Sequence, residues 1–129
     1  MDVAESLLRA IGDVVRLDDE GQMDAVTGVS GSGPAYVFHL VETLAAAGQA
    51  QGLSAELAMQ LAKATVAGAG ALALTAEESP AQLRVNVTSP NGTTQAGLDV
   101  LMDPKTGLPP LVSSTVAAAA ERSRELARG

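Results

Sequence analysis

The sequence predicts an all-α fold in a single domain, and three observations support this prediction. Apolar residues recur every three or four positions over several long segments. No segment shows the strand–turn–strand pattern that is typical of paired strands. The hydrophobic content is 47% with one Phe and one Tyr, so aliphatic side chains and alanines must build the core. We therefore expect about six to seven helices over residues 1–129, packed closely through small side chains.

The N-terminal quarter has the weakest pattern. We expect a helix over residues 3–11 and an extended segment over residues 13–17. The acidic cluster Asp18–Glu20 is consistent with either a solvated turn or a helix start. A short helix should follow over residues 23–30 and end at the break Gly31–Pro34.

Two long helices form the middle of the expected fold. Pro34 suits the first position of a helix that runs to Gln51, with Ser32 or Gly33 at its cap. Ser54 should cap the next helix, over residues 55–74.

The second of these helices carries small residues four positions apart, at Ala64 and Gly68. Small residues at this spacing allow another helix to approach closely. Glycine inside a helix costs about 1 kcal/mol relative to alanine, so a packing reason is the favoured interpretation. The other interpretation is that these glycines are tolerated on the surface.

Three further helices are expected in the C-terminal half. A short one should start at Ser79-Pro80 and reach residue 87, and the next should cover residues 93–102. After a turn at Asp103–Gly107, the last should run from residue 108 to residue 127. Its apolar stripe has the spacing of a helix-packing face and consists of Val112, Val116, Ala119, Ser123 and Leu126.

The segment Asn86–Thr94 is the most informative stretch. Pro90 disfavours helix at the preceding residue, and Asn91-Gly92 readily adopts positive φ, so the chain should turn sharply here. A helix that starts at Thr93 leaves its first N–H groups without partners, which makes its start suitable for a small anion such as a carboxylate. The alternative is that Thr93 or Ser89 only caps the helix.

Two blocks of the sequence resemble one family. The first runs from Gln82-Leu83 through Asn86 to Thr88-Ser89-Pro90-Asn91-Gly92-Thr93-Thr94 and Ala96-Gly97-Leu98, and the second is Asp24–Phe38. Both are similar to pyrroline-5-carboxylate reductases, at the expected separation. The likeness covers the C-terminal, dimer-forming half of such enzymes, and their nucleotide-binding half has no counterpart in this sequence.

The resemblance implies a function and a set of site residues. Such enzymes use NAD(P)H to reduce 1-pyrroline-5-carboxylate to L-proline, the last step of proline biosynthesis. By likeness, the substrate-binding residues are Glu20, Gly92, Thr93 and Thr94, and Asn86 reaches toward the cofactor. Thr94 is the catalytic candidate, and the proton for the imine nitrogen comes either from its hydroxyl or from water.

The resemblance also implies partners. The family forms intertwined homodimers, in some cases assembled further into rings of dimers. We expect no tight NAD(P)H binding and no turnover by this chain alone. The alternative function is a catalytically silent helical module for self-association, as an excised or engineered piece would be.

Composition excludes several other classes of protein. The net charge of −7 disfavours nucleic acid as a partner, because phosphates would be repelled. With no Cys and one His, neither a disulfide framework nor a metal site is expected. The apolar run over residues 64–76 is short for a bilayer, so we expect no membrane association and a cytoplasmic location.

Overall fold

The structure is a computed structural model, and it describes the backbone of residues 20–128 and the side chains of residues 22–128. The expected helix over residues 3–11 and the extended segment over residues 13–17 lie outside the described residues. Within them the fold is all-α without a strand, as expected. The helical elements are α2 (Glu20–Val26), the π-helix η1 (Thr27–Gly31), α3 (Gly33–Ala50), α4 (Ala55–Thr75), α5 (Pro80–Asn86), α6 (Thr93–Leu101) and α7 (Leu108–Arg128).

Helix starts agree closely with the expected cap residues. The Ser54 hydroxyl accepts a hydrogen bond from the N–H of Leu57 at the start of α4, and the Ser79 hydroxyl accepts one from Gln82 at the start of α5. Both satisfy a backbone donor that the helix itself cannot. Pro34 lies at the second position of α3 rather than the first, and Ser32 precedes that helix without a side-chain cap.

The expected short helix over residues 23–30 is longer and changes type. It begins at Glu20 as α2 and continues into η1, in which the N–H of Ser32 donates to the carbonyl of Thr27, five residues back. The Tyr36 hydroxyl donates to the carbonyl of Gly28 at 2.9 Å and ties α3 to this π-helical turn. The glycine- and proline-containing break is therefore a tight junction between two helices.

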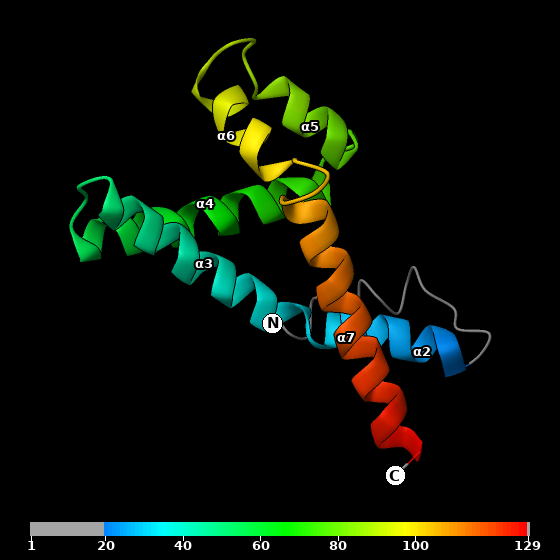
Figure 1. The fold of residues 1–129 in the computed structure, drawn as a ribbon. Helices are drawn as coiled ribbons and strands as arrows, with labels where there is room; N and C mark the ends of the chain where they lie inside the picture. Colours follow the sequence, from blue (N-terminus) through cyan, green and yellow to red (C-terminus); the bar gives the residue numbers. More distant parts are fainter. Residues whose placement is uncertain (1–19, 129) are drawn as a thin grey trace.

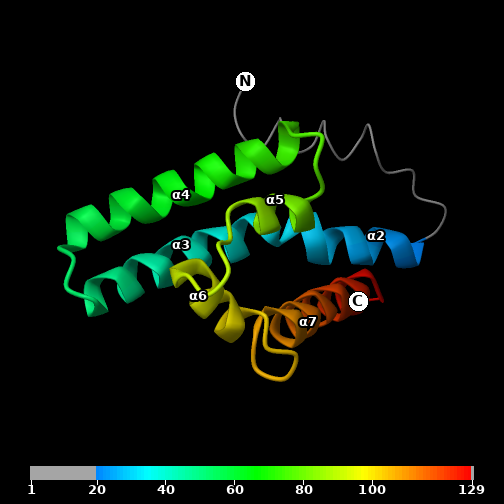
Figure 2. The ribbon, with the colours of Figure 1, turned by 90° about the horizontal axis from the view of Figure 1, so that it is seen from above.

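The first packing contact is the antiparallel pair α3–α4, which lies side by side in both ribbon views (Figures 1 and 2). Its buried side chains are Ala45 on α3 and Ala58 and Ala62 on α4. Val41 and Met59 pack against them. Because the buried side chains are single methyl groups, the helix axes approach closely and little apolar area is removed from water.

The second packing contact joins α2 and η1 to α7. Gly28 is buried there, and a Cβ at this position would lie 2.9 Å from the carbonyl oxygen of Val116 and 3.3 Å from the nitrogen of Ala120. The Ser123 hydroxyl adds a hydrogen bond to Asp24 at 2.7 Å. The central part of the expected stripe on the last helix is used in this contact, while Val112 and Leu126 at its ends remain 47% and 65% exposed.

The helices α5 and α6 stand apart from both packed groups (Figures 1 and 2). Neither contains a buried residue, and neither makes contacts with another described helix comparable to those of the two packed groups. We call this pair with its connecting loop, residues 80–101, the α5–α6 unit.

The surface of the described region carries many large apolar side chains. The most exposed include Phe38 at 67%, Leu74 at 72% and Val100 at 75%. Patches of this kind on a single chain mark interaction surfaces.

By length and composition alone, α4 is the one described helix that could cross a membrane. It contains an 18-residue stretch with a mean hydropathy of 1.4, of which only 11% is buried in the chain. The expectation that no apolar run is long enough was therefore wrong, because the helix adds residues 55–63 to the run and the single Lys63 there lowers the mean too little.

Candidate functional site

The loop between α5 and α6 is anchored by hydrogen bonds at its first residues. The Thr88 hydroxyl donates to the carbonyl of Arg84 at 2.6 Å, and the Thr88 N–H donates to the carbonyl of Val85 at 3.1 Å. These bonds use carbonyls at the end of α5 that have no acceptor role inside the helix. The loop thus leaves α5 in a fixed direction.

A tight turn over Ser89–Gly92 follows. The N–H of Gly92 donates to the carbonyl of Ser89 at 3.1 Å, with Pro90 and Asn91 between them. The expected positive φ occurs at Asn91, at 61°, but not at Gly92, where φ is −89°. The left-handed position therefore belongs to Asn91, whose side chain tolerates it, and Gly92 is needed for a different reason. A Cβ on Gly92 would lie 3.3 Å from the Ser89 carbonyl oxygen.

The start of α6 has no side-chain cap. Gly92 occupies the cap position in extended conformation, so the alternative in which Thr93 or Ser89 caps the helix is wrong. In the described region the N–H groups of Thr93, Thr94 and Gln95 have no acceptor, and the hydroxyls of both threonines engage no other group. Thr93 and Thr94 are exposed. Donors at a free helix start, together with the helix dipole, favour an anion.

The remaining expected site residues are placed less directly. Asn86 is the last residue of α5 and is exposed, and its Oδ1 accepts a hydrogen bond from Gln82 Nε2 at 2.7 Å. Glu20 is the first residue of α2, and its side chain lies outside the described residues. The loop therefore brings together Gly92, Thr93 and Thr94, with Asn86 at its other end.

A groove of about 220 Å³ lies between α5 and α6. Its lining combines one cation and two polar side chains with an apolar floor, and consists of Arg84, Thr88, Gln95, Val85, Leu98 and Met102. Sequence reasoning did not identify this groove, and none of the expected site residues lines it. Helical spacing offered a signal, because Arg84 and Thr88 are four residues apart and Leu98 and Met102 are also four apart.

The turn after α6 contains the clearest electrostatic feature of the described residues. The Asp103 carboxylate accepts hydrogen bonds from the N–H groups of Lys105 and Thr106, at 2.8 and 2.9 Å. These bonds lower the pKa of Asp103 from its ordinary value of 3.8, because they stabilise the charged form. Asp103 joins α6 to α7, so this effect belongs to the turn and not to the candidate site.

The described residues do not form a dinucleotide site by themselves. Such sites use a glycine-rich turn from a strand into a helix, and residues 20–128 contain no strand. Among these residues no cluster of three or more His, Asp or Glu side chains is placed to hold a metal ion. What the loop offers is a set of backbone donors and two hydroxyls.

Comparisons with known proteins agree on one family. The family model described as pyrroline-5-carboxylate reductase dimerisation matches residues 20–126. The pyrroline-5-carboxylate reductase of Pseudomonas aeruginosa is 49% identical over 124 residues, which are 96% of this chain and 45% of that enzyme. The enzyme of Pisum sativum is 47% identical over 93% of this chain and 43% of its own length.

Solved structures show the same relation. The pyrroline-5-carboxylate reductase of Coxiella burnetii has a TM-score of 0.82 at 42% identity, over 96% of this chain and 45% of that one. The Plasmodium falciparum enzyme, solved with NADP bound, has a TM-score of 0.77 at 31% identity, over 97% of this chain and 48% of that one. The chain therefore spans somewhat less than half the length of the relatives that it matches.

Proposed function

The chain belongs to the pyrroline-5-carboxylate reductase dimerisation family, and from this premise we propose that it forms a homodimer and binds the carboxylate of 1-pyrroline-5-carboxylate or L-proline. The observation that carries the ligand part is the uncapped start of α6 at Gly92-Thr93-Thr94. In the reaction of such enzymes, the cyclic imine gains a hydride from NAD(P)H at carbon and a proton at nitrogen.

In this proposal, each site residue has one task. The N–H groups of Thr93 and Thr94 hold the carboxylate, and the Thr94 hydroxyl faces the ring nitrogen and is the candidate proton donor. Asn86 contributes an amide at the edge that faces the cofactor, and Glu20 is an acidic contact for the substrate. Holding the substrate by its carboxylate fixes the reacting carbon, which is the main service that a protein renders to a nicotinamide reaction.

The dimer is proposed from the exposed apolar surface and the family match together. We propose that the apolar faces of α4 lie against a second copy rather than in a bilayer, so that the domain works in the cytoplasm without a membrane or nucleic-acid partner. The small residues Ala64 and Gly68 on that helix leave room for such an approach, since no atom lies within 4 Å of a Cβ built at Gly68.

Titration with L-proline tests the carboxylate site. We expect the amide signals of Thr93 and Thr94 to shift, with a dissociation constant of about 1 mM, which corresponds to about −4 kcal/mol. The affinity is low because the site is open to water and an exposed helix start contributes only about 0.3–1 kcal/mol. L-Prolinamide, which lacks the carboxylate charge, should shift these amides much less.

Two variants sharpen this measurement. Thr94→Val removes the hydroxyl at nearly constant volume and should weaken binding severalfold while leaving the helix intact. Thr43→Val, in which the lost hydroxyl donates to the Leu40 carbonyl on α3, is the matched control and should bind like the parent protein. Equal shifts with L-proline and L-prolinamide would show that the loop is no carboxylate site.

The second candidate function, a catalytically silent assembly module, is favoured by the absence of a dinucleotide turn among the described residues. An NAD(P)H oxidation assay with pyrroline-5-carboxylate separates the two. We expect no turnover by this chain alone and measurable turnover when a nucleotide-binding domain from a relative is supplied separately. Turnover by the pure chain that Thr94→Ala abolishes would contradict the first expectation. No gain on adding that domain would favour the silent module.

A further inference from the structure

We propose that a second copy of this chain packs against the α5–α6 unit and thereby holds its loop in the binding geometry, so that self-association and carboxylate binding are thermodynamically linked. The proposal rests on the proposed function and adds a dependence that neither the fold nor the family assignment states. It concerns residues 80–101, which carry four of the five candidate site residues.

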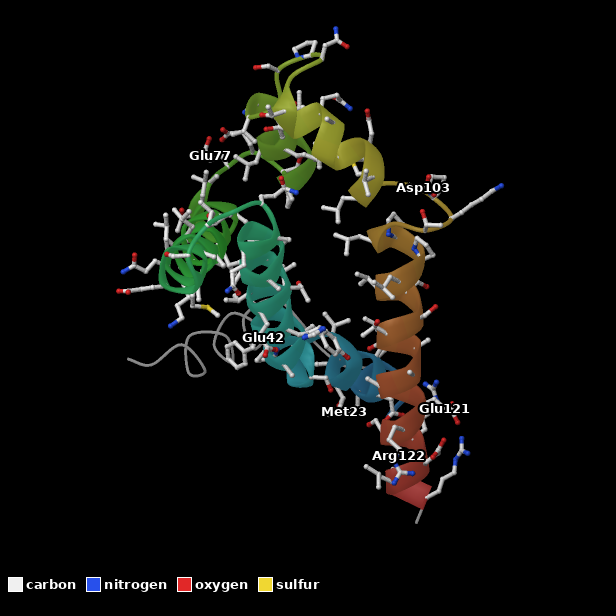
Figure 3. All side chains as sticks on the ribbon, turned by 60° about the vertical axis from the view of Figure 1, so that its left-hand side comes forward. Met23, Glu42, Glu77, Asp103, Glu121 and Arg122 are labelled. Carbon is white, nitrogen blue, oxygen red and sulfur yellow. The ribbon has the colours of Figure 1, made fainter. Side chains whose placement is uncertain are left out.

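The first step is that the chain itself does not fix the position of this unit. No side chain of α5 or α6 is buried, and the extensive helix contacts of the described region all lie elsewhere. Figure 3 labels Glu77 and Asp103, which lie in the two connections that join the unit to α4 and α7. Covalent connections and one short turn are therefore the main restraints that this chain supplies.

The second step is that the unit is too small to be stable on its own. The helix α5 has 7 residues and α6 has 9. Isolated helices shorter than about 12 residues are marginal in water, because helical stability comes chiefly from packing an apolar face. The N–H groups of Thr93 and Thr94 point in one direction only while α6 is formed. The binding geometry consequently needs a packing partner.

The third step identifies that partner. The unit and the residue after α6 expose apolar side chains with fractions of 55% for Val85, 70% for Val87, 75% for Val100, 46% for Leu101 and 45% for Met102. A surface of this kind suits an apolar partner. The family match that is defined by dimerisation runs continuously through both helices, from residue 20 to residue 126. A two-fold symmetric contact would let each copy cover the other's unit.

Linkage then follows from mass action. If the loop binds carboxylate only when the unit is packed, a ligand at ten times its dissociation constant occupies two sites per dimer. It should lower the dimer dissociation constant by about a hundredfold. The reverse effect is a loss of apparent affinity on dilution below the dimer midpoint.

The experiment uses the whole chain and the variant Val100→Asp, which places a charge on the most exposed apolar side chain of the unit. Sedimentation gives the dimer midpoint, amide hydrogen exchange reports the packing of α5 and α6, and NMR titration with L-proline reports binding. We expect the variant to be monomeric, to lose exchange protection in residues 80–101, and to bind L-proline at least tenfold more weakly. For the parent protein, saturating L-proline should shift the dimer midpoint to lower protein concentration.

Controls separate unfolding and added charge from the proposed cause. The single Tyr36 reports on the α3–η1 junction, so its unchanged fluorescence would show that the rest of the chain is folded. Lys105→Asp adds more negative charge in the turn after α6 without removing apolar surface, and it should behave like the parent protein.

The outcomes discriminate between this proposal and the proposed function. A monomeric Val100→Asp variant that binds L-proline with the parent's affinity would overturn the linkage and leave the carboxylate site standing. A parent dimer that does not bind L-proline, but whose α5–α6 amides gain protection with association, would retain the packing step and refute the carboxylate site. A variant that stays dimeric with protected α5–α6 amides would assign the unit's apolar surface to another partner, such as a nucleotide-binding domain, and would overturn the proposal.

Discussion

Asp103 shows how one side chain can close a connection between two helices. Its carboxylate accepts the N–H groups of Lys105 and Thr106, and the N–H of Gly107 donates to its carbonyl. The same turn brings Gly107 so close to the backbone of Leu101 and Asp103 that a Cβ there could not be accommodated without movement. The turn sets the path from α6 into α7, so its chemistry bears on where the α5–α6 unit is held.

The lowered pKa of Asp103 predicts an acid-sensitive contribution to stability. Because the folded pKa lies below the unfolded value of 3.8, the contribution is complete above about that pH and is lost as the pH falls through the folded pKa. Asp103→Ala should therefore flatten the dependence of unfolding free energy on pH below about 5 and leave the slope near neutrality unchanged.

Urea unfolding followed by circular dichroism from pH 2.5 to 7 measures this slope. Asp99→Ala, on the exposed side of α6, is the control for removing a carboxylate, and it should retain more of the acid dependence. An Asp103→Ala profile that parallels the parent's over the whole range would contradict the assignment.

At the scale of elements, the contact of η1 with α7 depends on the absence of a side chain at Gly28. The π-helical turn presents this residue directly to the backbone of Val116 and Ala120. The carbonyl of Gly28 also accepts the Tyr36 hydroxyl, so one residue joins three elements. Small side chains determine the α3–α4 contact in the same way, and both contacts are tight although they bury little area.

Gly28→Ala should consequently destabilise the fold. A Cβ at 2.9 Å from the Val116 carbonyl oxygen forces α7 away, and overpacking of this kind costs about 1–3 kcal/mol. The measurement is the free energy of unfolding at fixed protein concentration, since association contributes to it.

Gly31→Ala is the matched control within the same turn. A Cβ there would meet only the Thr27 methyl group, at 3.6 Å, which is an ordinary contact. Its effect should be small or stabilising, by up to about 1 kcal/mol. Equal losses for the two variants would mean that the turn rejects any side chain and that the close approach to α7 is not the cause.

At the scale of the whole molecule, the described chain leaves most of its large apolar side chains outside its own core. The four buried hydrophobic residues are all alanines, whereas Leu57, Leu61 and Leu72 on α4 are 43%, 48% and 52% exposed. Ala58 and Ala62 of α4 face α3, so the expected seam that includes Ala64 and Gly68 lies on another side of the helix. A single copy thus exposes the surfaces that an assembly would bury.

Gly68→Leu should weaken self-association, because a large side chain in the seam separates the helices that meet there. Gly70→Leu is the matched control, since it makes the same change on the same helix two residues away, off the seam, where a Cβ also meets nothing within 4 Å. Light scattering at micromolar concentration should show a lower mass for the first variant than for the second. A parent protein that is folded but monomeric under these conditions would rule out the assembly itself.

Much of this protein could be predicted from local sequence. Serine–proline and serine caps, helical periodicity and the absence of strand patterns gave the fold class and most helix boundaries, because these signals act over a few residues. The two family-like blocks pointed to the family to which the chain belongs. The threonine-rich loop was also found in this way, although its role as a site remains a proposal.

Tertiary structure alone decided the rest. Which residue of Asn91-Gly92 has positive φ depends on how the turn closes on Ser89, and the expectation for Gly92 was wrong for that reason. The π-helical turn arises because Gly28 must meet both α7 and Tyr36. The separation of the α5–α6 unit was not visible in periodicity, because an apolar stripe shows that a face will be buried and does not show which chain will bury it.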